Sequence, residues 1–287
     1  MLKATIYNLD FFEQFLSIVN KFVQQCRFEL STKELNVYCL NRQVFPSSRL
    51  LLNTNVIKLN ENQEVDLINI CVRDVVALKS ALSIVSQLED VEGIEIGLDT
   101  VKYDNELLVK SIKYKSKKGS NFNLITIDYD VIKDLVTKDV VNNYDENWSF
   151  NINPIMLDIV QNKTSNIVNL DQVSIYIYPR EENGPAIVNL ASKKTSALNS
   201  ITIPISDNSV GSLNGFKYEV NGIVISPKEV AVHESAFRIF NILKTQDSAD
   251  IHCSFNFASK FFYIKSKLKN NQYEINSRLY VGIANGK

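Results

Sequence analysis

The sequence predicts an α+β protein in which one kind of unit, an amphipathic helix followed by several short strands, occurs four times. Three observations support this prediction. Apolar residues repeat at helical spacing in four segments, alternating apolar and polar residues follow each of them, and a charged segment divides the chain near its middle. The 287 residues are enough for two domains of about 100–200 residues. We therefore expect two domains of similar plan, each with two helices on one side of an antiparallel sheet.

The first helix is the best defined. Its apolar face lies between Leu9 and Gln25, at Phe11, Phe12, Phe15, Leu16, Val19, Phe22 and Val23. Apolar and polar residues then alternate through RFEL and LNVYCL, on either side of the polar turn STKE, and SRLLLN follows. Such alternation is typical of half-buried strands. The predicted unit is therefore a helix, a hairpin and a third strand.

The second helix is predicted from Arg73 to Leu88, with a buried stripe of Val75, Leu78, Leu82 and Val85. Strands are expected in GIEIGLD, TVKYD, ELLVKSIKYK and FNLITID. The charged segment from Tyr129 to Trp148 has no such period. It predicts a first domain at residues 1–128, a connector at 129–148 and a second domain at 149–287.

Two further helices are expected in the second domain. The third begins at Asn153, a good N-cap, and Pro154 fits the first helical position because its missing N–H costs nothing there. The fourth begins with SPKE, in which Ser226 and Glu229 predict a capping box. Its apolar stripe is Val230, Phe237, Phe240 and Leu243. Short alternating segments follow both helices.

Composition excludes several classes of protein. The net charge of −1 excludes a nucleic-acid-binding protein that is strongly basic as a whole. No apolar run approaches the roughly 18 residues of a membrane span. No two cysteines form a CxxC pair among Cys26, Cys39, Cys71 and Cys253. We therefore expect buried thiols in a reducing compartment, and no metal site.

Catalytic motifs are also missing from the sequence. The two histidines are His233, expected on the fourth helix, and His252, expected in a strand. Neither belongs to a recognisable nucleophile pattern, and no phosphate-binding glycine motif follows a predicted strand. We predict a protein that is not an enzyme and that needs no cofactor.

The whole pattern resembles the DNA polymerase sliding clamps, the family of proliferating cell nuclear antigen and the clamps of tailed phages. The best local matches are CRFELSTKELNVYCLNRQVFPSSRLLL and NICVRDVVALKSALSIVSQLEDVEGIEIGLD in the first half, and GPAIVNLAS and GIVISPKEVAVHESAFRIFNILKTQD in the second. The resemblance covers nearly the whole chain. It implies the DNA clamp fold, with two clamp-type domains that each contain a pair of helix-plus-strand units.

The resemblance also implies a function. Such clamps close as rings of six domains, so two domains per chain imply a homotrimer with head-to-tail contacts. The ring is a processivity factor without an active site, which encircles double-stranded DNA independently of its sequence and tethers DNA polymerase and other replication proteins. A clamp loader is a further implied partner. The lack of a targeting segment fits work at the replication site in a cytoplasm, including that of a phage-infected bacterium.

In such a ring the polar helix faces line the central hole, where contacts with DNA go to phosphates. The basic residues implied to face DNA are Lys21, Arg73, Lys79, Lys163, Lys228, Arg238 and Lys244. The same helices carry nearly as many acids, so charge alone does not identify this face. The run KSIKYKSKKG also places Lys113, Lys115 and Lys117 on one strand face. That face is either a contact with DNA or a partner, or a solvated strand that discourages edge pairing.

Ring closure in the family pairs edge strands of neighbouring chains. The corresponding residues here are Phe122, Leu124, Ile125 and Ile127 on one strand, and Ala186, Ile187, Val188 and Leu190 on the other. Partner peptides of clamps enter a pocket beside the connector. Its implied wall is Leu40, Val44, Phe45, Ile132, Leu135, Tyr280 and Ile283, although the last residues, VGIANGK, have no firm match.

Two alternative functions stay open. Some viral processivity factors resemble one clamp subunit and bind DNA as monomers through a basic face. The near-neutral charge of this chain argues against that mode, because a monomer must gain its affinity from phosphate contacts. The second alternative is a structural phage protein of mixed α and β structure, which would not influence a polymerase.

Overall fold

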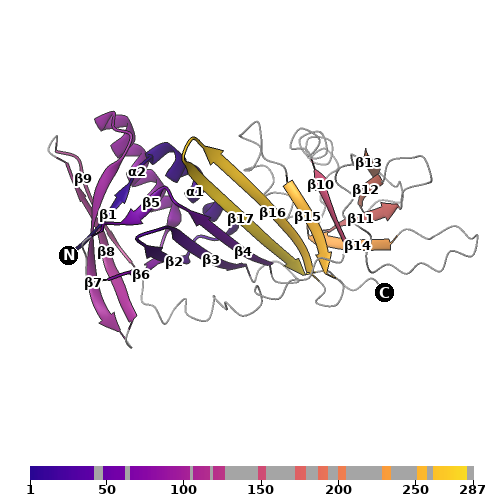
Figure 1. The fold of residues 1–287 in the computed structure, drawn as a ribbon, viewed down its shortest axis with the longest axis horizontal. Helices are drawn as coiled ribbons and strands as arrows, with labels where there is room; N and C mark the ends of the chain where they lie inside the picture. Colours follow the sequence, from indigo (N-terminus) through magenta and orange to yellow (C-terminus); the bar gives the residue numbers. More distant parts are fainter. Residues whose placement is uncertain are drawn as a thin grey trace, which may run out of the picture. The chain divides into compact units, whose positions relative to one another are not determined.

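The computed structural model describes residues 1–41, 48–61, 65–103, 106–116, 119–126, 148–152, 172–178, 187–192, 200–204, 228–233, 251–256 and 261–282 (Figure 1). The chain divides into two compact units. The first comprises Met1–Asn41, Arg49–Asp139 and Leu268–Ser277, and the second comprises Arg42–Ser48, Val140–Lys267 and Arg278–Lys287. Neither helix in the described part is long and apolar enough to cross a membrane.

The first unit contains two helices and one curled sheet. Its elements are β1 (Leu2–Ile6), α1 (Leu9–Phe22), β2 (Cys26–Ser31), β3 (Leu35–Asn41), β4 (Ser48–Thr54), β5 (Ile57–Leu59), β6 (Leu67–Val72), α2 (Val75–Glu89), β7 (Ile94–Tyr103), β8 (Glu106–Lys115) and β9 (Asn121–Ile125). The tip of the hairpin formed by β16 (Phe261–Asn270) and β17 (Tyr273–Gly282) completes it. The strand order is β17-β4-β3-β2-β6-β8-β7-β1-β5, with β9 on β8.

This unit is built from one motif used twice, first as β1-α1-β2-β3-β4 and then as β6-α2-β7-β8-β9. The first strand of each copy pairs antiparallel with the second strand of the other, β1 with β7 and β6 with β2. The remaining strands are added outward, β3 and β4 beyond β2, and β8 and β9 beyond β7. The repetition predicted for the first half of the chain is therefore confirmed.

Local chemistry sets the bounds of α1. The Asn8 side chain accepts a hydrogen bond from the Phe11 N–H at 2.8 Å, which satisfies one of the free donors at the start of the helix. The helix ends at Phe22, because Val23 adopts an extended backbone with φ of −147°, so it stops before the predicted Gln25. Most of the predicted stripe is buried, at Phe11, Phe12, Phe15, Leu16, Val19 and Phe22.

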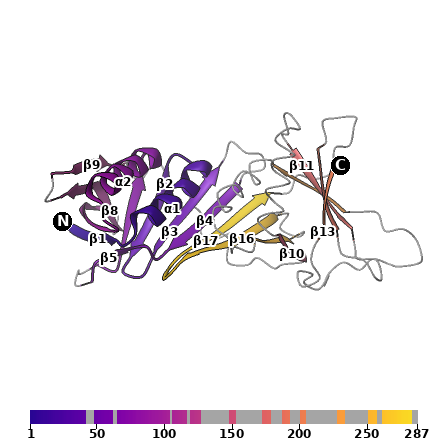
Figure 2. The same cartoon turned by 90° about the horizontal axis from the view of Figure 1, so that it is seen from above.

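The second helix is confirmed with similar bounds. The Asp74 carboxylate caps α2 by accepting from the Val76 and Ala77 N–H groups at 2.8 and 3.1 Å. At the other end, Asp90 takes a left-handed conformation with φ of 49°. The predicted stripe of Val75, Leu78, Leu82 and Val85 is buried. The two helices lie side by side against the sheet (Figure 2).

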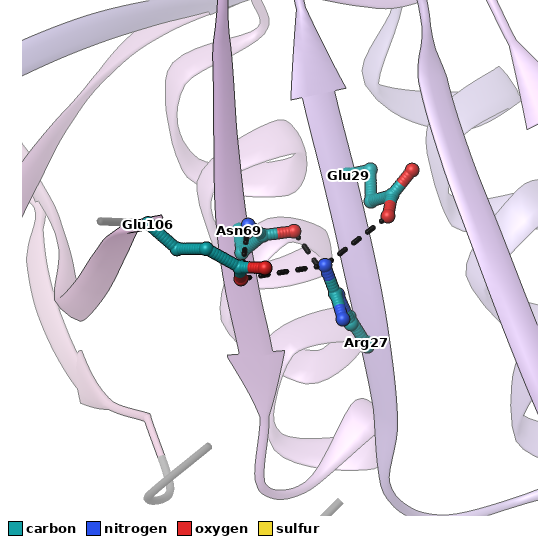
Figure 3. Close-up of polar contacts among 4 residues, drawn as sticks. All are labelled: Arg27, Glu29, Asn69 and Glu106. Carbon is teal, nitrogen blue, oxygen red and sulfur yellow. Dashed lines mark hydrogen bonds and ion pairs between the residues drawn. The ribbon is translucent and has the colours of Figure 1, made fainter. Parts of the chain in front are cut away.

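A polar cluster bridges a short parallel pairing in this sheet. Strands β6 and β8 run parallel and share a register of two residue pairs, Asn69 with Leu108 and Ile70 with Val109. Next to them, Arg27 Nε donates to Asn69 Oδ1 at 3.0 Å, and Asn69 Nδ2 donates to Glu106 Oε2 at 3.1 Å (Figure 3). The Arg27 guanidinium also pairs with Glu29 at 3.2 Å and Glu106 at 3.5 Å. These contacts join β2, β6 and β8 beside this short backbone ladder.

The second unit repeats the strand pairings of the first. Its strands are β10 (Trp148–Ile152), β11 (Gln172–Tyr178), β12 (Ile187–Ser192), β13 (Ser200–Pro204), β14 (Lys228–His233), β15 (Ile251–Asn256) and the remaining parts of β16 and β17. β10 pairs with β15 as β1 pairs with β7, and β14 pairs with β11 as β6 pairs with β2. One sheet has the order β13-β12-β11-β14.

The fourth predicted helix is wrong at its start. Residues 228–233 form β14, an antiparallel partner of β11 in which Lys228 pairs with Ile177 and His233 with Gln172. The reason is the alternation in KEVAVH, which places two valines on one strand face, and pairing with β11 outweighs the short capping signal in SPKE. His233 is therefore in a strand. Phe237, Phe240, Leu243 and the whole third predicted helix lie outside the described residues.

Candidate functional site

The exposed surface of the helix pair is the candidate nucleic-acid face. The helices run antiparallel, since the start of α1 contacts the end of α2, where Ser86 Oγ donates to Asp10 Oδ1 at 3.3 Å. One turn further along, Glu13 faces Lys79 and Ser83. Burial, with a smaller contribution from the Asp10 charge, raises the pKa of the Glu13 carboxyl, while Lys79 and Ser83 oppose the rise.

The structure describes three of the predicted DNA-facing residues on this helix pair. Lys21 is exposed in the last turn of α1, where a cation is favoured by the helix dipole. Arg73 is exposed directly before the Asp74 cap of α2, and Lys79 is half-buried. These cations share the face with Asp10 and the partly buried Glu13, so the described part of this surface is nearly neutral.

One of the remaining predicted cations lies in the described part of the chain. Lys228 was expected on a helix, but it begins strand β14, so its assignment to a helical DNA face is withdrawn. The other three, Lys163, Arg238 and Lys244, lie outside the described residues.

The basic run on β8 faces away from the helices. Tyr114 points toward α2, because its hydroxyl donates to Glu89 Oε2 at 2.7 Å, so the alternate residues Lys113 and Lys115 project from the opposite sheet face. Lys113 forms an ion pair with Asp99, whereas Lys115 is exposed. Within the described part of the chain, this run is therefore not continuous with the surface of the helix pair. Lys117 lies outside the described residues.

Strand β9 offers an open edge. It pairs with β8 from Ser111–Ile125 to Lys115–Asn121, and no other described strand pairs with it. The side chains of Asn121, Asn123 and Ile125 are exposed to solvent, and that of Ile125 is 71% exposed. Phe122 and Leu124 are half-buried, and the Phe122 ring stacks on Tyr114 at 5.6 Å. Ile127 lies outside the described residues.

Helix α2 carries an apolar row that the sequence reasoning missed. The residues are Val76, Ile84 and Leu88, with exposed fractions of 45%, 56% and 68%. Spacings of eight and four residues keep them close to one helix face, and α2 packs beside β9. The sequence could have indicated this row, because these apolar residues of α2 do not belong to its buried stripe.

The second predicted edge strand needs correction. Ile187, Val188 and Leu190 belong to β12, which pairs with β11 on one side and β13 on the other, so neither edge of β12 is free. β13 is the terminal strand of this sheet in the described part. The edge position therefore falls on Ser200–Pro204. Ala186 lies outside the described residues.

One residue of the predicted peptide pocket has a described environment. Tyr280 is buried on β17, with its ring centroid 4.8 Å from that of Tyr263. Burial raises the pKa of the Tyr280 hydroxyl. Leu40 lies on β3, with its side chain outside the description, and Val44, Phe45, Ile132, Leu135 and Ile283 lie outside the described residues. The pocket stays a prediction.

Comparison with solved structures gives the fold its name. Proliferating cellular nuclear antigen from Entamoeba histolytica superimposes with a TM-score of 0.63 at 13% identity, over 99% of this chain and 99% of that chain. The chain has the sliding-clamp fold. A chain of the PCNA2–PCNA3 complex from Sulfolobus tokodaii gives a TM-score of 0.61 at 9% identity, over 98% of this chain and 99% of that chain.

The clamp fold is not apparent from sequence similarity. No protein-family model matches the chain, and no curated protein sequence is detectably similar to it. At such low identity the two solved structures show the fold alone. The predicted fold class, α+β with clamp-type domains, is confirmed by these matches.

Proposed function

We propose that this chain is a DNA polymerase processivity factor that closes with two further copies into a ring around duplex DNA. The observation that carries the proposal is a pair of strand edges without a described partner. In the first unit the end strand of the first motif, β4, is already paired with β17. The strand at the same motif position in the second unit is β13. β17 ends the second motif of the second unit, and the strand that ends the second motif of the first unit is β9.

Pairing β9 of one chain with β13 of the next would repeat the β4–β17 joint between molecules. Such a contact is head-to-tail, and it closes into a ring when the rotation per chain fits a whole number of copies. The apolar row on α2 supports this assembly. Val76, Ile84 and Leu88 are exposed on α2, the helix that contacts β9, and exposed apolar residues near an open strand edge are a liability unless another surface covers them.

The nearly neutral helix pair supports encirclement over direct affinity. A monomer that binds DNA must neutralise many phosphates, and each such contact adds to the salt dependence of binding. Lys21, Arg73 and Lys79 are few for that purpose, and Asp10 and Glu13 stand among them. A closed ring needs only weak phosphate contacts that allow sliding. Polymerase and clamp loader are the proposed partners, and no catalytic role is assigned to any residue.

The first test is the mass of the protein in solution. Light scattering over a concentration series should show a species of three times 32.6 kDa, about 98 kDa. A protein that stays at 32.6 kDa at high concentration would contradict the ring and favour a monomeric DNA-binding factor.

The second test separates the two sheet faces. Reversing charge with Lys21→Glu and Lys79→Glu should shorten the products of primer extension by the cognate polymerase, because both residues belong to the helix pair. The matched control is Lys115→Glu, which makes the same charge change on the opposite sheet face and should leave product length unchanged. Equal effects of the two sets would remove the helix pair as the DNA-facing surface.

A further inference from the structure

Three cysteines of the first unit lie on three adjacent strands. Cys26 begins β2, Cys39 lies near the end of β3, and Cys71 lies on β6. All three are free thiols and all are buried, with exposed fractions of 2%, 5% and 2%. The proposed ring assigns no role to any of them.

The strand register places two of these thiols opposite each other. β2 and β3 are antiparallel, with Arg27 opposite Tyr38 and Leu30 opposite Leu35, so the next step outward sets Cys26 opposite Cys39. Directly opposed residues have Cα atoms roughly 4.5–5.5 Å apart. Disulfides span Cα separations of roughly 4.4–6.8 Å. Opposed side chains of neighbouring strands project from the same sheet face, and the Cys39 thiol is near enough to add to the rise that burial causes in the pKa of Cys26.

The third thiol points the other way. Cys71 pairs with Arg27 across β2 and β6, and Arg27 is the neighbour of Cys26 in sequence. Since successive residues of a strand project to opposite faces, Cys71 and Cys26 lie on opposite sides of the sheet. The first unit thus contains one opposed pair and one nearby thiol that serves as an internal control.

We propose that Cys26 and Cys39 form a redox-modification site that closes into a cross-strand disulfide when a peroxide oxidises it. One thiolate attacks a peroxide oxygen, the O–O bond breaks, and the departing hydroxide takes up the proton that the thiol released, which gives a sulfenic acid and water. The second sulfur then attacks the sulfenic sulfur. The S–S bond forms, the S–O bond breaks and a second water leaves. The two thiols supply the two electrons that reduce the peroxide.

Burial sets the rate of this reaction. Desolvation raises the pKa of the Cys26 thiol well above its ordinary value, so the reactive thiolate is scarce at neutral pH. Oxidation is therefore slow at pH 7 and faster at pH 9. The product joins the start of β2 to the end of β3 and closes a loop around residues 27–38. This cross-link restricts the unfolded chain, so the oxidised protein unfolds at a higher temperature than the reduced protein.

The test uses the purified full-length chain and hydrogen peroxide. After incubation at pH 7 and pH 9, the non-reduced protein should be lighter by about 2 Da, the mass of the two hydrogens lost. Peptide mapping should recover a Cys26–Cys39 linked peptide, which dithiothreitol separates. Cys71→Ser should retain the link, and Cys39→Ser should lose it. Because a polar residue at a buried site can prevent folding, Cys39→Ala is compared with it by circular dichroism.

The peptide map of the unmodified chain decides the proposal without any variant. A linked peptide that joins Cys26 to Cys71, or joins two chains, would overturn it. So would the addition of two oxygens to either cysteine with no S–S bond. Retention of both free thiols after excess peroxide at pH 9 would overturn it as well.

Discussion

Strands β4 and β9 hold the same position in the two motifs of the first unit, but β4 has a second partner strand and β9 has none among the described residues. β17 pairs with β4. Around this joint, Asn55 Nδ2 donates to the Gln272 carbonyl at 3.0 Å and the Glu274 N–H donates to Asn55 Oδ1 at 2.8 Å. Asn276 Nδ2 donates to Asn53 Oδ1 at 2.8 Å. The corresponding edge of β9 is bounded instead by exposed Ile125.

The two edges also differ in the side chains around them: asparagines bridge the β4–β17 joint, whereas β9 exposes Ile125 together with Asn121 and Asn123, and α2 adds the exposed apolar row. Hydrogen bonds from asparagine side chains select one register between the two strands, and they suit a joint that forms once, when the chain folds. An apolar surface is less directional and suits a contact that forms between molecules already folded. One structural position thus serves both to build the subunit and, on our proposal, to join subunits.

The largest effect is expected from a charge on the open edge. Ile125→Asp removes about 2 kcal/mol of apolar burial from each contact between chains, which is about thirtyfold in affinity, and it adds a carboxylate that must be desolvated. We expect the species of three chains to disappear in light scattering at concentrations where the unmodified protein is assembled. Far-ultraviolet circular dichroism should be unchanged, because Ile125 is 71% exposed in the single chain.

The matched control is Leu67→Asp, which places the same charge on an exposed apolar residue of β6. Leu67 is 47% exposed, but it is not on β9 or α2, so the solution mass should stay that of the unmodified protein. Dissociation by both variants would mean that added charge acts non-specifically, and it would remove the distinction between the open edge and the rest of the surface.

The intermediate effect is expected at the covered edge. Asn55→Ala removes two hydrogen bonds, and the Glu274 N–H and Gln272 carbonyl lose their partner, so the free energy of unfolding should fall by about 1–3 kcal/mol. Urea denaturation measures this change. Asn121→Ala is the control, because its side chain makes one long contact of 3.4 Å on the exposed β9 and should change stability far less. Equal losses would show that the Asn55 contacts do not strengthen the β4–β17 joint.

Much of this comparison could be predicted from residue patterns, where the signal is local and long. The apolar stripes of α1 and α2 were enough to predict both helices. Seven and four apolar residues recur at the helical period, and no competing pattern overlaps them. The SPKE motif led to the wrong prediction of a helix start, because a capping signal covers only one turn. The alternation in KEVAVH fits a strand that pairs with β11.

The partners of edge strands were harder to predict. A strand's neighbours depend on contacts between distant parts of the chain, so alternation alone could not separate β12, which is paired on both sides, from the terminal β13. For the same reason nothing local to Leu268–Ser277 indicated that this hairpin tip completes the first unit and contacts Asn53 and Asn55.

The smallest effect is expected one strand inward from the open edge, on the sheet face that Lys113 shares with Ile125. Lys113 lies opposite Asn123 of β9, and its ammonium group pairs with Asp99, which also accepts from Ser111 Oγ at 3.1 Å. The hydrogen bonds from Lys113 and Ser111 lower the pKa of the Asp99 carboxyl. A lowered pKa in the folded state stabilises the fold above the ordinary carboxyl pKa of about 4, and this contribution is lost as the pH falls through the folded value.

Lys113→Met should therefore raise the pKa of Asp99 toward its ordinary value, as followed by nuclear magnetic resonance of its carboxyl carbon. The variant should be slightly less stable than the unmodified protein above about pH 4, and the two stabilities should converge in stronger acid. The solution mass should stay unchanged, because Lys113 lies on β8, one strand inward from the open edge, and the substitution adds no charge. A variant that dissociates the assembly would mean that the contact between subunits includes β8 as well as β9.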